Sequence, residues 1–140
     1  MICLAAEASQ RCPDAKLVFF TPDTDVLVLA VAHYDKLCKK TSLSMVSGME
    51  DIEPIWRALG KEKAQALPIF HAFTGADNVG KFLGIRKTKW FQQYMKADVD
   101  LPRALTKLPM DGDLTQEMKD ELAICMLQVL SQGCLHYKYT

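Results

Sequence analysis

The most informative hydrophobic pattern lies between residues 16 and 37. Residues 17–20 form a short apolar run, L-V-F-F, of side chains that favour strands, and Thr21-Pro22 interrupts it. A second, mostly apolar segment extends from residue 26 to residue 37, after two aspartates. The first run predicts a buried strand over 16–21. The second is long enough for a helix, although its β-branched residues leave a strand open.

The rest of the chain predicts further helices and a second strand. Gly60 is placed to end one helix, and Pro68 is expected to bend or interrupt another. This mixture of strands and helices predicts an α/β fold: a small, mostly parallel sheet with flanking helices and a helical C-terminal part. We expect the second strand over 42–47 and helices over 2–10, 51–59, 61–74, 87–96, 101–108 and 114–131.

Composition and net charge limit the classes of protein to be considered but do not indicate an activity. The formal net charge is zero, so bulk electrostatics indicate neither a nucleic-acid nor a membrane partner. No apolar run is long enough to span a bilayer, and the N-terminus does not have the pattern of a signal peptide. The five cysteines include no C-x-x-C pair. We therefore expect reduced thiols, an intracellular protein and no disulfide-linked partner.

The two aspartates that follow the first strand, Asp23 and Asp25, are candidate metal ligands. If the backbone stays extended through them, side chains two residues apart point the same way, and two carboxylates face one cleft. Mg²⁺ and Mn²⁺ favour such oxygen ligands. The structural alternative is that Pro22-Asp23 forms a turn and that Asp25 caps a helix that starts at Val26.

A second candidate site surrounds Asp77 in a glycine-rich segment. Gly75, Gly80 and Lys81 have the spacing of a phosphate-binding P-loop. However, Phe82 stands where that motif needs serine or threonine, and the preceding segment is predicted as helix rather than strand. The sequence therefore disfavours a P-loop.

The segment after Asp77 is basic and contains aromatic residues. No acidic residue occurs between Asp77 and Asp98, and this interval contains Trp90, Phe91 and Tyr94. Such a segment suits contact with a phosphate backbone. The alternative is a solvated helix face whose aromatic side chains lie in the core. The basic residues of the interval are Lys81, Arg86, Lys87, Lys89 and Lys96.

Three motifs together resemble a known family. They are F-F-T-P-D-T-D-V-L-V-L at 19–29, A-L-P-I-F-H-A-F-T-G-A-D-N at 66–78 and F-L-G-I-R-K-T at 82–88. In this combination the chain resembles the C-terminal half of a PIN-like nuclease domain of the flap-endonuclease type, and more closely a group of uncharacterised invertebrate PIN-like proteins. The resemblance covers about residues 1–108 and leaves 109–140 as a C-terminal helix and tail.

The resemblance implies metal-dependent hydrolysis of phosphodiester bonds in DNA or RNA. Asp23, Asp25 and Asp77 match the catalytic, metal-binding aspartates of the family, which implies Mg²⁺ or Mn²⁺ as the cofactor. The segment around Gly84 falls where the family grips the nucleic-acid backbone. The residues that would make these contacts are Lys81, Gly84, Arg86, Lys87 and Lys89.

The chain also departs from the family pattern. The family has an aspartate on its first strand and a glutamate motif, E-E-A-D in the close relatives, before the aspartate pair. Neither is present, Glu7 is not a counterpart, and Arg86 replaces an expected glycine. The resemblance thus implies a truncated domain with about half of the acidic site and an exposed sheet edge.

Two other functions remain open. The first is a non-catalytic nucleic-acid-binding or interaction protein that retains the fold. The second is a phosphatase of the haloacid-dehalogenase type, because a strand followed by Asp23-x-Asp25 also resembles the first motif of that family.

Overall fold

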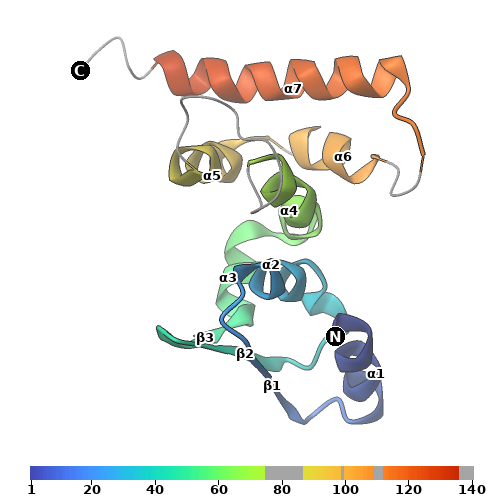
Figure 1. Cartoon of the computed structure of the whole chain (residues 1–140), viewed down its shortest axis with the longest axis vertical. Coiled ribbons are helices and arrows are strands. Elements are labelled where there is room, and N and C mark those ends of the chain that lie inside the picture. The colour runs from blue at the N-terminus through green and yellow to red at the C-terminus, as the bar shows by residue number, and fades with distance from the viewer. Residues whose placement is uncertain (75–86, 99, 109–111, 136–140) are drawn as a thin grey trace. The chain divides into compact units, whose positions relative to one another are not determined.

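The computed structural model describes residues 1–74, 87–98, 100–108 and 112–135 (Figure 1). The chain divides into two compact units, Met1–Pro68 and Ile69–Thr140. The first unit contains a small sheet with helices, and the second is helical in its described part. The predicted α/β class with a helical C-terminal part is therefore confirmed.

A three-stranded mixed sheet organises the first unit, in the order β1 (Lys16–Phe20), β2 (Lys40–Met45), β3 (Gly48–Asp51). β1 and β2 are parallel, whereas β2 and β3 are antiparallel. The prediction of a mostly parallel sheet missed β3, because no strand was expected after the one over 42–47. Instead Met45 pairs with Gly48 across a two-residue turn, and the positive φ of Gly48, 134°, suits the start of the returning strand.

The parallel strands are joined by a helical crossover, since a tight hairpin cannot connect them. This crossover consists of α2 (Thr24–Ala32) and the short 3₁₀ helix η1 (Tyr34–Lys36). The run over 26–37 is thus helical rather than a strand. After β3, helix α3 (Ile52–Leu59) ends at Gly60, whose φ is 79°. Gly60 therefore ends this helix as predicted.

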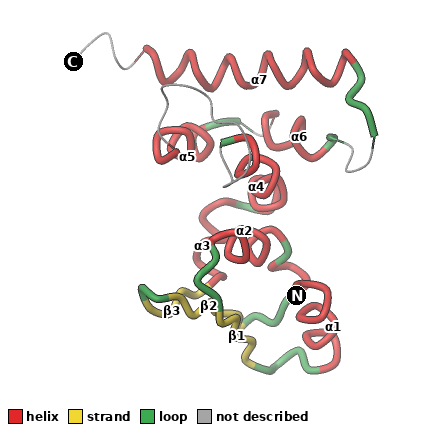
Figure 2. The backbone as a smooth tube through the Cα atoms, in the orientation of Figure 1, coloured by secondary structure: helices red, strands yellow, loops and turns green. Residues whose placement is uncertain are grey.

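One face of the sheet carries the core of the first unit. Phe19 and Leu43 are register partners and are 6% and 0% exposed, and Ile52 and Val31 from the helices are also buried. Helices α2 and α3 lie over this face (Figure 2).

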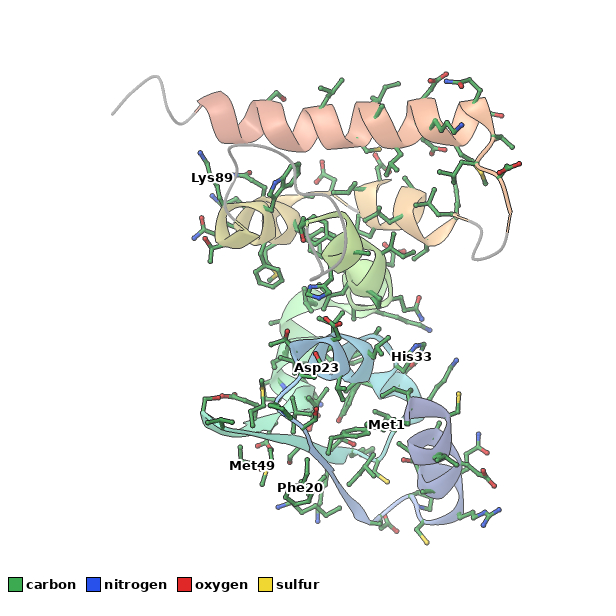
Figure 3. The ribbon with its side chains drawn as sticks, viewed as in Figure 1. Met1, Phe20, Asp23, His33, Met49 and Lys89 are labelled. Carbon is green, nitrogen blue, oxygen red and sulfur yellow. The ribbon has the colours of Figure 1, made fainter. Side chains whose placement is uncertain are left out.

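The opposite face, which we call the open sheet face, has no described helix of the first unit over it (Figure 1). Phe20 and Met49 project from it away from α2 (Figure 3) and are 79% and 53% exposed. By strand alternation and register, this face contains Lys16, Val18, Phe20, Lys40, Ser42, Ser44, Met49 and Asp51.

Helix α1 (Ile2–Arg11) is attached to the segment before β2 through one buried hydroxyl. Ser9 Oγ donates to the carbonyl oxygen of Ala5 at 2.8 Å and accepts from the backbone N–H of Cys38 at 3.0 Å. The thiol of Cys38 also donates to Ser9 Oγ at 3.2 Å. Ser9 on α1 therefore provides the acceptor for the buried backbone N–H of Cys38.

The second unit packs around aromatic and aliphatic side chains. Phe70 stacks on Tyr94 with ring centroids 4.1 Å apart and meets Trp90 edge-on at 6.5 Å. Burial raises the pKa of the Tyr94 phenol well above its usual range. Leu105 and Leu122 are buried where α6 contacts α7. The helices are α4 (Lys61–Phe73), which begins in the first unit, α5 (Lys87–Lys96), α6 (Asp100–Thr106) and α7 (Gln116–Leu135).

Most helix predictions agree with these bounds within a few residues, and α5 agrees at both ends. Pro68 lies inside α4, so the helix is not interrupted there. No helix in the described ranges is long and apolar enough to cross a membrane. The four cysteines with described side chains, Cys3, Cys12, Cys38 and Cys125, are free thiols.

The core face of the sheet and the exposed turn between β2 and β3 should respond differently to truncation. Leu43→Ala removes a side chain that is 0% exposed, and we expect the free energy of unfolding to fall by about 2–5 kcal/mol. Val46→Ala, at a position 95% exposed, should change it by less than about 0.5 kcal/mol. Urea unfolding followed by circular dichroism measures both. Equal losses for the two variants would contradict the assignment of the core face.

Candidate functional site

The aspartate pair lies where β1 ends and α2 begins. The backbone N–H of Thr21 donates to the carbonyl oxygen of Ser44 at 3.2 Å, which continues the parallel ladder past Phe20. Thr21 Oγ1 then accepts from the backbone N–H of Asp23 at 3.1 Å. Asp23 is the N-cap of α2, and its Oδ1 accepts from the backbone N–H of Asp25 at 2.9 Å. Figure 3 labels Asp23 at this junction.

This geometry differs from the backbone that each of the two sequence interpretations of the pair assumed. The backbone is extended at Asp23, with φ −86° and ψ 119°, but α2 begins at Thr24. The condition that the chain stays extended through both residues is therefore not met. The cap is Asp23 rather than Asp25, and the helix starts two residues earlier than Val26. Asp25 lies in the first helical turn, where a negative charge is favourable.

Both carboxylates have access to solvent, so they could bind an ion. Mg²⁺ commonly takes one or two carboxylates from the protein and completes its shell with water and substrate phosphate. Asp23 and Asp25 fit that donor chemistry. Within the ranges that the structure describes, no group of three or more His, Cys, Asp or Glu side chains could hold a metal ion. The third expected ligand, Asp77, lies outside the described residues.

The predicted nucleic-acid contacts lie in the second unit. Lys81, Gly84 and Arg86 are outside the described residues, and Lys87 begins α5 with a side chain that is not described. Lys89 is half-buried on α5. Thus the described part of the expected site consists of Asp23 and Asp25 in the first unit and Lys89 in the second.

The aromatic residues that follow these basic residues have mainly a structural role. Trp90 and Tyr94 are 2% and 0% exposed and pack on Phe70, whereas Phe91 is 42% exposed. The interpretation that aromatic side chains of this segment lie in the core is confirmed for Trp90 and Tyr94. Neither ring is available to stack on a base.

Sequence reasoning missed a basic cluster at the amino ends of β1 and β2. Lys16, Lys39 and Lys40 line a pocket of about 300 Å³ together with Thr41, Ser42 and the start of α3. Lys16 and Lys40 are partners in the parallel register. They are 24 positions apart in the sequence. The available signal was that each predicted strand has a lysine at or just before its start, but only the register brings these lysines together.

The comparisons with known proteins leave the function to be argued from the residues. No protein-family model matches the chain, no curated protein does, and no solved structure matches the fold.

The capping role of Asp23 can be tested without metal. Asp23→Ala removes the acceptor for the Asp25 N–H, and we expect the free energy of unfolding to fall by about 1 kcal/mol. Asp23→Asn keeps a capping side chain and should stay close to the parent protein. Urea unfolding measures both variants, with Asp35→Ala as a control at an exposed aspartate in η1. If Asp23→Ala were no less stable than Asp23→Asn, Asp23 would not cap α2.

Proposed function

We propose that the end of β1 is part of a divalent-metal site for hydrolysis of nucleic-acid phosphodiesters, as in PIN-like nucleases of the flap-endonuclease type. The observation that carries this proposal is the position of two solvent-accessible carboxylates, Asp23 and Asp25, at the carboxyl end of a parallel strand. Open α/β sheets place ligand sites at this edge. The resemblance of the sequence motifs adds Asp77 as a third ligand.

In this proposal, Asp23 and Asp25 hold Mg²⁺ or Mn²⁺ beside the scissile phosphate. The N-cap contact fixes the Asp23 side chain before any ion binds, so less side-chain freedom is lost on binding. When bound, such an ion lowers the pKa of a coordinated water and stabilises charge on the phosphate oxygens. The backbone of the nucleic acid would be positioned by Lys81, Gly84, Arg86, Lys87 and Lys89 without reading its sequence.

Hydrolysis of a phosphodiester by two metal ions requires more acidic ligands than the three aspartates that the resemblance identifies. A two-ion mechanism needs ligands on both sides of the reacting phosphate. Asp23, Asp25 and Asp77 account mainly for one ion of such a pair. We therefore propose that the chain binds metal by itself and hydrolyses nucleic acid only when further carboxylates complete the site.

A second candidate is a non-catalytic nucleic-acid-binding protein that retains the fold. The hydrogen bond from the Asp25 N–H to Asp23 Oδ1 favours it, because this contact explains the presence of Asp23 without any metal. The two candidates differ in whether the aspartates bind an ion.

Calorimetric titration with Mn²⁺ separates these candidates. Asp23→Asn and Asp25→Asn each remove one negative charge, and we expect each to weaken Mn²⁺ binding by at least about tenfold. Asp23→Asn is informative because it keeps the helix cap, so lost binding cannot be attributed to lost structure. Asp35→Asn is the matched control, since Asp35 is exposed in the same unit away from the pair.

Unchanged or absent Mn²⁺ binding would contradict the metal-site proposal. If the folded parent protein bound no Mn²⁺, or bound it as tightly after both substitutions, the aspartates would serve α2 alone. The non-catalytic candidate would then be favoured.

A further inference from the structure

The three lysines at the amino ends of β1 and β2 form a cluster whose positive charge is not balanced by ion pairs in the described part of the structure. Lys16 and Lys40 lie directly opposite each other in the parallel register, and like charges in such positions are destabilising. Lys39 lines the same pocket. Within the described ranges, no ion pair involves any of these three side chains. The repulsion would be relieved by an anion.

The two carboxylates of this pocket already have partners. Asp51 Oδ1 accepts from the hydroxyl of Ser42 at 2.8 Å, and Glu53 Oε1 accepts from Arg57 at 2.6 and 2.9 Å. The Glu53 charge is therefore balanced by Arg57, which leaves one carboxylate beside three lysines. A phosphate group supplies the charge and the acceptor oxygens that lysines bind.

The open sheet face connects this cluster to an exposed aromatic ring. Lys16, Val18 and Phe20 alternate with Leu17 and the buried Phe19 along β1, so they point to one side of the sheet. Phe20 is 79% exposed and lies about 13 Å along the strand from Lys16, at roughly 3.3 Å per residue. Phe20 and Met49 lie on opposite sides of Ser44, because both are in register with it. Figure 3 shows Phe20 and Met49 projecting from the same side of the sheet.

We propose that the open sheet face binds single-stranded nucleic acid. Phosphates lie on Lys16, Lys39 and Lys40, and a base stacks on Phe20. Surfaces that combine basic side chains with an uncovered aromatic ring bind single strands, because the base faces of single strands are free to stack. A duplex offers phosphates to the lysines but no base face to Phe20. This binding needs no divalent ion, so the inference goes beyond the proposed function and stands apart from the Asp23 and Asp25 site.

A fluorescent oligothymidylate in EDTA tests the proposal, with anisotropy measured at several salt concentrations. We expect Lys39→Ala with Lys40→Ala to weaken binding and to reduce the slope of log affinity against log salt by about 1.4, from about 0.7 for each lost phosphate contact. Phe20→Ala should weaken binding by at least about fivefold and leave this slope unchanged. Lys16 is kept in all variants because it lies on the edge strand.

Matched controls come from elsewhere on the surface. Lys36→Ala with Lys61→Ala removes two exposed lysines outside the pocket, and Ile124→Ala removes an apolar side chain that is 57% exposed on α7. Both controls should bind as the parent protein does. Circular dichroism of every variant verifies that it is folded.

Three outcomes would overturn the proposal. The first is no binding by the folded parent protein. The second is a Phe20→Ala variant that binds like the parent while inorganic phosphate competes for the lysines, which would indicate a small phosphate pocket. The third is a dimer in sedimentation that Phe20→Ala dissociates, which would make a second copy the occupant of this face. Because EDTA is present throughout, failure of the Mn²⁺ site does not affect the result.

Discussion

The parallel pairing of β1 with β2 is the constraint on which the first unit depends. Phe19 and Leu43 are opposite each other in this pairing and are buried under α2 and α3. Parallel strands also require the chain to cross back over the sheet, which α2 and η1 accomplish. The two ends of the pairing therefore receive different residues: aspartates where β1 ends and lysines where both strands begin. The parallel pairing, made possible by this crossover, therefore places the acidic candidate site at one end of the strands and the basic candidate site at the other.

The sequence was sufficient for elements with a strong periodic pattern. The apolar run of β1 and the spacing in α3 and α5 depend on local composition, so they could be predicted. β3 could not, because Gly48–Asp51 is entirely exposed and owes its structure to a turn and a partner strand. The cap of α2 was shifted by two residues for a related reason. Either aspartate can cap a helix, and the hydrogen bond from Thr21 that orients Asp23 is not visible in the sequence.

The candidate sites show the same division between local and tertiary information. The aspartate pair was identified because its two members are close in sequence. The lysine cluster was not predicted, because it depends on the register between β1 and β2, which the pattern of residues does not specify. The aromatic rings of α5 had two interpretations, and only packing on Phe70 distinguished them. Sequence patterns therefore identify a candidate site more readily when its residues lie in one segment than when strand pairing brings them together from separate segments.

The position of β1 at the edge of the sheet affects the behaviour of the chain in solution. One side of β1 pairs with β2, and its other side has no strand partner in the described part of the structure. Five residues rich in strand-forming side chains on a bare edge are a template for cross-β assembly. Lys16 is the only charged residue in this strand and acts as a gatekeeper, because stacking copies in register would bring its charges together. Neutralising this one charge would therefore remove a barrier to fibril growth without disturbing the buried core.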